Sequence, residues 1–124
     1  EDWETIIRTN LRSCFLCSKA AMQKMRDQKS GRIVNIASIV GHRGALYGHV
    51  HYAATKSGMF GFTKTLARTA AEYGITVNCV APGFIDTDMT KDLLLYAIFH
   101  RLLFVPKGIN ICGYWVPPPM FLKR

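Results

Sequence analysis

RIVNIAS at residues 32–38 and ITVNCV at residues 75–80 flank a longer segment, HYAATKSGMFGFTKTLARTAAEY at 51–73, and this arrangement decides the fold of the chain. The first segment is short and rich in β-branched residues, which predicts a largely buried strand. The last predicts a second strand, and the middle segment predicts a helix that Gly74 closes. Strand, helix and strand form a βαβ unit, which almost always makes a right-handed crossover between parallel strands. The sequence therefore predicts an α/β fold.

A further helix is expected before this unit. Apolar residues recur at spacings of three and four from Trp3 to Met25, which is the period of an amphipathic helix, and Gly31 provides a stop. Asn10 falls close to the apolar stripe, where an amide needs a partner, usually local backbone or water. The predicted order is helix, strand, helix, strand.

Functional residues are expected at the carboxyl ends of the two strands, because ligands of open α/β sheets bind there. Ser38 ends the first strand segment, and Pro82 and Gly83 follow the second. Tyr52 comes near the start of the second helix, after a glycine-rich loop, so it can reach the same edge. The three segments are predicted to converge on one cleft.

Tyr52 and Lys56 are four residues apart, so on a helix they share one face and lie about 5.4 Å apart along the axis. An ammonium beside a phenol favours the phenolate, which makes Tyr52 a candidate proton donor. Tyr and Lys at this spacing also occur by chance in many helices. The pair alone therefore does not identify a site.

The composition narrows the function classes. The chain has 124 residues, about one small domain, and a net charge of +8. Its basic residues are scattered singly from Arg8 to Arg124, without a cluster or interleaved aromatic residues, which argues against a nucleic-acid surface. The cysteines lack the second Cys or His pair of a zinc site, so we expect no metal and ordinary apolar packing for Cys14, Cys17, Cys79 and Cys112.

No signal peptide and no apolar stretch long enough to span a bilayer is present, so we expect a cytosolic or organelle-matrix protein. The chain opens at Glu1 inside the first helix, so we expect that upstream sequence is missing. Ala54, Gly58 and Gly61 give the second helix a small-residue face. This face could approach another subunit or pack on the sheet, and both alternatives stay open.

Four separated elements resemble the short-chain dehydrogenase/reductases, and among them the 3-oxoacyl-acyl-carrier-protein reductase type. They are Ser38, the Tyr52-x-x-x-Lys56 pair, the turn APGFIDTDMT at 81–90 and Asn10 in the preceding helix. The resemblance covers residues 1 to about 93. It implies a partial Rossmann-type doubly wound parallel sheet, an NAD(P)(H)-dependent oxidoreductase and a homo-oligomer, a dimer or tetramer, when intact.

The resemblance also implies roles for individual residues. Tyr52 would protonate the carbonyl oxygen, Ser38 would donate a hydrogen bond to it, and Asn10 would position a water for proton relay. Lys56 would favour the Tyr52 phenolate and hold the nicotinamide ribose. In the turn, the family implies contacts to the cofactor from Pro82, Gly83, Ile85 and Thr87.

Three departures from the family pattern stand out. The spacing from Ser38 to Tyr52 is fourteen, one longer than expected, so the loop 39–51 should bulge. The glycine-rich βα turn that holds the dinucleotide pyrophosphate is absent, and with it the choice between NAD and NADP, although the resemblance slightly favours NADP. Residues 93–124 lack the family's later helix, final strand and glycine pair, so we divide the chain into a dinucleotide-binding part, 1–92, and an atypical tail.

Three readings of function follow. The first is an oxidoreductase that interconverts a carbonyl and a secondary alcohol, with a substrate that could be carried on acyl carrier protein. The second is an inactive truncated reductase that acts only by pairing with intact subunits. The third treats the tail as an interfacial membrane segment, although its amphipathic pattern is poor.

Overall fold

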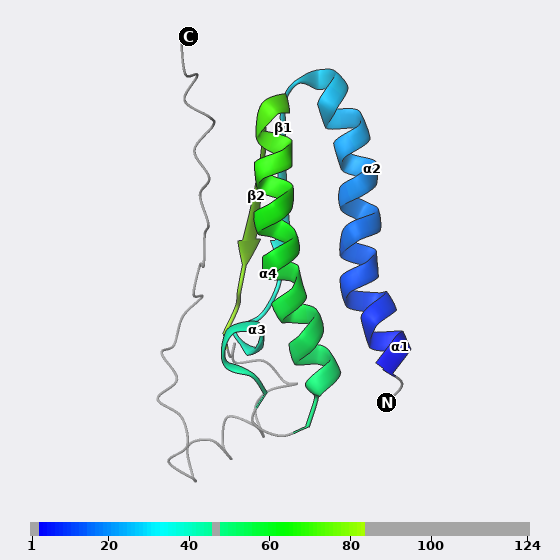
Figure 1. The fold of residues 1–124 in the computed structure, drawn as a ribbon, viewed down its shortest axis with the longest axis vertical. Coiled ribbons are helices and arrows are strands. Elements are labelled where there is room, and N and C mark those ends of the chain that lie inside the picture. The colour runs from blue at the N-terminus through cyan, green and yellow to red at the C-terminus, as the bar shows by residue number, and fades with distance from the viewer. Residues whose placement is uncertain (1–2, 46–47, 84–124) are drawn as a thin grey trace.

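The computed structural model describes residues 3–45 and 48–83 (Figure 1). A continuous helical segment opens the chain and contains three parts: α1 (Trp3–Ile6), the π-helix η1 (Ile7–Arg12) and α2 (Ser13–Gln28). The βαβ unit follows, with a short helix in its first loop: β1 (Gly31–Ile36), α3 (Val40–Arg43), α4 (Val50–Ala70), the 3₁₀ turn η2 (Ala71–Tyr73) and β2 (Ile75–Val80).

The two strands are parallel, as predicted. Their register runs from Gly31 opposite Ile75 to Ile36 opposite Val80. Hydrogen bonding continues beyond the strands, because the Ala37 N–H donates to the Val80 carbonyl at 2.8 Å and the Ile39 N–H donates to the Pro82 carbonyl at 2.9 Å. The α/β fold and the order helix, strand, helix, strand are therefore confirmed.

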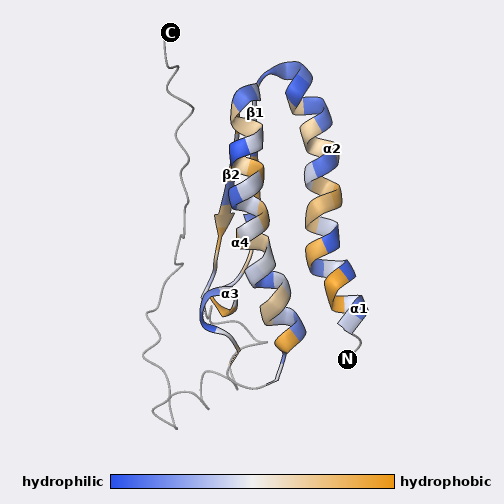
Figure 2. Ribbon diagram, in the orientation of Figure 1, coloured by the Kyte–Doolittle hydropathy of each residue, from blue (hydrophilic) through white to orange (hydrophobic). Residues whose placement is uncertain are grey.

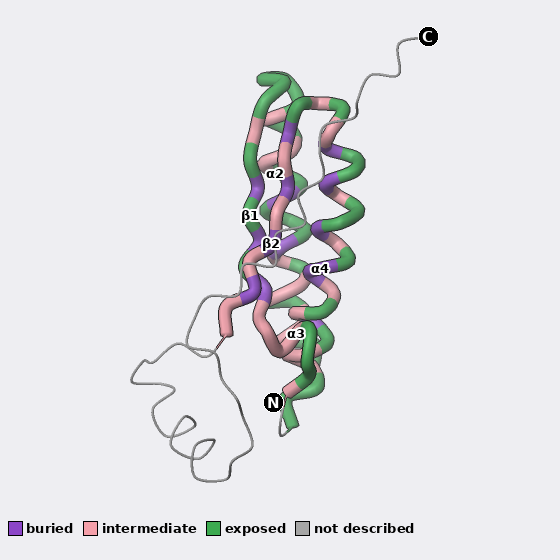
Figure 3. The backbone as a smooth tube through the Cα atoms, turned by 90° about the vertical axis from the view of Figure 1, so that its left-hand side faces the viewer, coloured by how far each residue is buried: buried purple, intermediate pink, exposed green. Residues whose placement is uncertain are grey.

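The described part of the chain has two layers. The long helices α2 and α4 lie on one face of the strand pair, where α4 packs mainly on β2 and α2 on β1 (Figures 1 and 3). The prediction of a largely buried first strand was wrong, since Val34 and Ile36 are 55% and 54% exposed while Ile33 is buried. The physical reason is that α2 and α4 cover only one face, so alternate β1 side chains reach solvent.

Two clusters of buried residues form the core. One lies near the carboxyl ends of the strands and contains Cys14, Ala37, Met59, Phe60, Cys79 and Ala81. The other lies near their amino ends and contains Ile33, Ala67, Ala70, Ile75 and Val77. Between them, the buried Asn35 amide donates to the Thr63 hydroxyl at 2.9 Å. Figure 2 shows hydrophobic residues along the strands and hydrophilic residues at the turn from α2 to β1.

The first helix ends earlier than Gly31, which was expected to stop it. Lys29 adopts a left-handed conformation with φ of 51°, and the N–H groups of Lys29 and Ser30 donate to the carbonyls of Arg26 and Met25. These bonds satisfy the last carbonyls of α2, so the chain already turns before Gly31, which begins β1. The second helix ends as predicted, with Gly74 left-handed at φ of 68°.

The small-residue face of α4 splits between two environments. Gly58 faces Leu11 of η1, because a Cβ placed on it would lie 3.2 Å from a Leu11 methyl carbon, whereas Gly61 has no atom within 4 Å of such a Cβ. Close packing within the chain therefore explains Gly58 only. None of the helices in the described ranges combines the length and apolar character needed to cross a bilayer. The expectations for Ile85, Thr87 and residues 93–124 lie outside the described residues.

Candidate active site

The predicted site lies where β1 and β2 end. Ser38 sits between Ala37 and Ile39, whose N–H groups pair with the chain leaving β2. This extension of the strand pairing places Ser38 alongside Ala81 and Pro82. The segment that follows β1 and the start of the APGF turn thus share one edge, as the sequence predicted.

Lys56 reaches the same edge from α4. Its ammonium donates a hydrogen bond of 2.9 Å to the carbonyl of Ile36, the last residue of β1. The same nitrogen lies 5.6 Å from the centre of the Tyr52 ring, one helical turn earlier. The sequence prediction that Lys56 stands beside Tyr52 on one face of the helix therefore holds in the structure.

The surroundings of Lys56 change its pKa in two opposing ways. Burial lowers the pKa of Lys56 below its ordinary value, because a half-buried ammonium loses hydration. Cys79 and Cys14 act in the opposite direction, more weakly. An ammonium carries three N–H donors, and the bond to Ile36 uses one of them. The remaining donors are available for oxygen atoms of a ligand.

Asn10 is tied to the same helix through Thr55. The Asn10 amide donates to the Thr55 hydroxyl at 3.2 Å, and this hydroxyl donates to the Tyr52 carbonyl at 2.8 Å. Thr55 is fully buried and was not singled out in the sequence. A signal was present, since a threonine between Tyr52 and Lys56 puts a hydroxyl on an inward face of the helix. Its partner is 45 residues away, which the spacing does not reveal.

The backbone around Asn10 is also unusual. Asn10 belongs to the π-helix η1, where one widened turn interrupts the regular helix. Such turns are rare and often occur at functional sites, because they shift the direction of side chains relative to an α-helix. Here the change falls where the Asn10 amide meets Thr55, so this amide has a side-chain partner across the fold, whereas the sequence predicted local backbone or water.

Ser38 contacts the start of the short helix α3, and α3 packs against α4. The Ser38 hydroxyl accepts a hydrogen bond of 3.2 Å from the Val40 N–H at the start of α3. Gly41 allows α3 to approach closely, because a Cβ at this position would lie 2.7 Å from the Lys56 backbone. The Ser57 hydroxyl donates to the Gly41 carbonyl at 2.6 Å. The loop predicted for residues 39–51 therefore contains a packed turn of helix.

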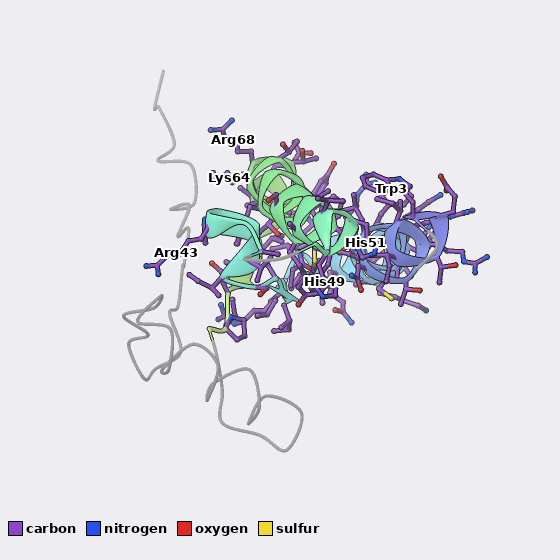
Figure 4. The ribbon with its side chains drawn as sticks, turned by 90° about the horizontal axis from the view of Figure 1, so that it is seen from below. Trp3, Arg43, His49, His51, Lys64 and Arg68 are labelled. Atoms are coloured by element: carbon purple, nitrogen blue, oxygen red, sulfur yellow. The ribbon has the colours of Figure 1, made fainter. Side chains whose placement is uncertain are left out.

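The start of α4 carries two histidines. His51 accepts the Tyr52 N–H at its Nδ1 atom, at 2.7 Å, and its ring centre lies 6.2 Å from that of His49. Figure 4 shows both histidines near the end of α4 that faces the viewer, Trp3 at the near end of the first helix, and Arg43 pointing away from the core. The N–H groups of the first turn of a helix have no acceptor within the helix. The Nδ1 atom of His51 provides one for the Tyr52 N–H.

A hollow of about 250 Å³ lies between the first helix, β1 and α4. Asn10 and Lys56 both line it, whereas Ser38 and Tyr52 are not part of its lining. Its other lining residues are Thr9, Ser13, Cys14, Cys17, Val34, Asn35, Ile36 and Met59. A larger hollow of about 730 Å³ lies at the opposite end of the strands, beside Arg26 and Tyr73, and so is remote from the predicted catalytic residues.

Two described segments offer groups that could hold one side of a bound nucleotide. Lys56 offers free N–H donors at the carboxyl end of β1, and Pro82 and Gly83 stand half-buried directly beyond β2. Within 3–45 and 48–83, the turns after both strands lack the glycine-rich pattern that holds a pyrophosphate. No cluster of three metal-ligating side chains occurs in these ranges either.

Comparisons with known proteins agree with the family that the sequence resembles. Residues 1–95 match the short chain dehydrogenase family. The chain is 54% identical over 93 residues to the 3-oxoacyl-[acyl-carrier-protein] reductase of Synechocystis, 53% to that of Vibrio cholerae and 55% to that of Escherichia coli. These matches cover 75% of this chain but only 37–38% of each relative. The chain therefore belongs to the short chain dehydrogenase family.

Proposed function

We propose that this chain is the catalytic part of an NAD(P)(H)-dependent oxidoreductase that interconverts a carbonyl and a secondary alcohol. The observation that carries the proposal is the connected set of contacts from Asn10 through Thr55 to Tyr52, and from Lys56 to the end of β1. The names of the relatives point to a 3-oxoacyl group carried on acyl carrier protein as the substrate. The dinucleotide-binding part is assigned to residues 1–92, and residues 93–124 to a separate tail.

The chemistry assigned to the residues follows from charge. Reduction of a carbonyl builds negative charge on its oxygen, which hydroxyl donors held in place stabilise. Tyr52 donates the proton to this oxygen and Ser38 donates a second hydrogen bond. The Lys56 ammonium lies 5.6 Å from the centre of the Tyr52 ring, so a positive charge stands beside the side chain that gives up the proton. Asn10 positions a water that resupplies the proton.

The cofactor side of the site is assigned to Lys56 and the turn after β2. Lys56 holds ribose hydroxyls with the N–H groups that Ile36 leaves available. Pro82, Gly83, Ile85 and Thr87 contact the nicotinamide end. The bound nucleotide supplies the hydride. NADP is preferred over NAD by resemblance to the family alone.

Tyr52→Phe tests the proposal in a version completed with a homologous first half and C-terminal end. Carbonyl reduction should fall by about 10²–10⁴-fold, the usual loss on removing a general acid. Binding of the nucleotide, followed by isothermal calorimetry, should persist. Tyr73→Phe is the matched control, because Tyr73 lies in η2 beyond the far end of α4, where its ring centre is 4.5 Å from the Arg26 guanidinium carbon. Turnover of Tyr52→Phe at the level of the unmodified enzyme would overturn the assignment.

A second function, pairing with other reductase subunits, is supported by the apolar surface of the helical layer. Trp3, Phe15 and Leu16 are each about half exposed, and Phe15 meets Phe62 of α4 edge to face at 6.5 Å. Such an exposed set on two helices suits a homodimer or homotetramer. Pull-down of an intact reductase by the 124-residue chain, lost in Phe15→Glu, would support pairing. A purely monomeric completed protein in size-exclusion chromatography would oppose it.

A further inference from the structure

Two cysteines of α2 border the hollow that contains Lys56. Cys14 and Cys17 are three residues apart, so on a helix they are neighbours on one face, with Cβ atoms about 5–6 Å apart. Both line the hollow, and both are thiols in this structure. Cys14 is buried with 9% exposure, whereas Cys17 is exposed to solvent. Apolar packing therefore explains Cys14 and leaves Cys17 without a structural reason.

We propose that Cys14 and Cys17 form an oxidisable dithiol that hydroperoxides convert to a disulfide at the mouth of this hollow. In the first step the Cys17 thiolate attacks the peroxide oxygen, the O–O bond breaks, and a sulfenic acid forms with release of water or an alcohol. In the second, the sulfur of Cys14 attacks the sulfur of Cys17, and the sulfenic hydroxyl leaves as water with the Cys14 proton. Two electrons pass from the two sulfurs to the peroxide.

The two cysteines have different roles because their surroundings differ. A peroxide must reach a thiol before it can react, and oxidation follows exposure and thiolate character. Cys17 is reachable from solvent. Burial raises the pKa of Cys14, Cys79 and Cys17 add to the effect, and Ser18 and Lys56 oppose it. Burial therefore shields Cys14 from direct attack by peroxide, and its thiol gives up its proton only as its sulfur attacks the sulfenic acid formed nearby.

Cys79 is the competing partner for Cys14. It lies in the same core cluster as Cys14, but it belongs to β2 and is only 1% exposed. A peroxide has no direct path to it, and a link from Cys14 to Cys79 would have to form between a helix and a strand inside the packed core. The pair on one face of α2, open to the hollow, is favoured by access.

Closing the disulfide requires a local change in the helix. Bridged cysteines have Cβ atoms about 3.5–4.5 Å apart, so the two Cβ atoms must approach by about 1–2 Å from helical spacing. Cys14 is the second residue after the π-helix η1, and the Ser13 N–H between them already faces two carbonyls, those of Arg8 and Asn10. This irregular turn gives the backbone room to tighten. The movement would reach Asn10, which precedes Ser13 by three residues.

Peptide mapping of the 124-residue chain tests the proposal without reference to catalysis. The chain is treated with hydrogen peroxide near equimolar amounts, blocked with iodoacetamide and digested with trypsin. Cys14 and Cys17 fall on one peptide, residues 13–19, while Cys79 falls on 69–91 and Cys112 on 108–123. We expect the 13–19 peptide to lose both iodoacetamide labels and two hydrogen atoms. Dithiothreitol should restore both labels.

Three variants and a denatured control make the result decisive. Cys17→Ser should abolish the loss of label at Cys14, and Cys14→Ala should leave Cys17 as a sulfenic acid that dimedone traps. Cys79→Ala should leave the internal disulfide unchanged. In concentrated urea the preference for the 13–19 disulfide should fall. Overoxidation of Cys17 without a disulfide, a link to Cys79 or Cys112, or the same pairing in urea would each overturn the proposal.

Discussion

The two ends of the βαβ unit differ in the side chains that form their cores and in their hydrogen bonds. The half around the carboxyl ends of the strands, which we call the site half, contains small and sulfur-containing side chains and Phe60. Hydrogen bonds there join distant segments: Asn10 to Thr55, Lys56 to Ile36, and Ser57 to Gly41. Around the amino ends, the far half, the buried cluster consists of Ile33, Ala67, Ala70, Ile75 and Val77. The same helix, α4, serves both halves.

The difference separates stability from positioning. Apolar burial in the far half is non-directional and grows with the area removed from water, so it holds α4 on the strands without fixing fine geometry. The hydrogen bonds of the site half depend on direction and distance, so they fix where Tyr52 and Lys56 stand. Substitutions in the far half should therefore change the free energy of unfolding, whereas those in the site half should change the chemistry.

Ile75→Ala is expected to have the largest effect on stability. Ile75 is 1% exposed in the far half, and removing its branched side chain should cost about 2–5 kcal/mol through lost burial and the cavity left behind. Cys79→Ala is the matched change in the site half, on the same strand and equally buried. It removes one sulfur and should cost about 1–2 kcal/mol. Urea unfolding followed by circular dichroism measures both. An equal or larger loss for Cys79→Ala would contradict the division.

The far half was the easier part to predict from sequence. Its strand and helix periods are local, and Gly74 marks the left-handed turn that precedes β2. The end of α2 was missed because Lys29, which has no special tendency to positive φ, takes the turn before Gly31. The exposure of Val34 and Ile36 was missed because it depends on which faces the helices cover, and the strand's own residues do not encode that.

In the site half, sequence predicted the pairs that a helix brings together and missed those that the fold brings together. Tyr52 and Lys56 follow from a spacing of four, and Ser38 and Pro82 from the ends of strands. Thr55 and its bond to Asn10 join residues 45 positions apart, and the widened turn at Asn10 has no mark in the local sequence. Long-range polar contacts are specified by tertiary packing, so periodicity cannot reveal them.

Thr63→Val tests the boundary between the halves. Its hydroxyl is the partner of the buried Asn35 amide, and valine keeps the shape while removing the acceptor. An unsatisfied buried donor costs about 1–3 kcal/mol, so stability should fall by that amount. Thr65→Val, on the exposed face of the same helix, is the control and should change little. A Thr63→Val variant as stable as the control would show that Asn35 finds another partner.

The pH dependence of the free energy of unfolding should include a contribution from Lys56. Because its folded pKa is lowered, the unfolded chain binds the proton more tightly between that pKa and the ordinary value of about 10.4. The free energy of unfolding therefore gains a rising contribution with pH in that window. Cys14 contributes the opposite slope, since its folded pKa is raised and the unfolded thiol ionises first.

Comparison within a Cys14→Ala background isolates the Lys56 contribution. In this background, unfolding midpoints in urea between pH values near neutrality and about 10 should rise relative to those of a Cys14→Ala, Lys56→Met double variant. The double variant retains a side chain of similar length and no titratable nitrogen. Parallel pH profiles for the two proteins would mean that Lys56 is as well hydrated in the folded state as in the unfolded one.

Gly61→Ala should have the smallest effect on the free energy of unfolding, and unlike Ile75→Ala and Thr63→Val it should stabilise the protein. Glycine inside a helix costs about 0.5–1 kcal/mol relative to alanine, and a Cβ at Gly61 would meet no atom within 4 Å, so the variant should be more stable by that amount. Gly58→Ala is the matched change three residues earlier, where Leu11 of η1 lies 3.2 Å from the added carbon and must shift. Gly58→Ala should therefore gain less or lose stability. Equal gains would mean that η1 is held loosely on α4, and Asn10, which belongs to η1, could then not be fixed against Thr55.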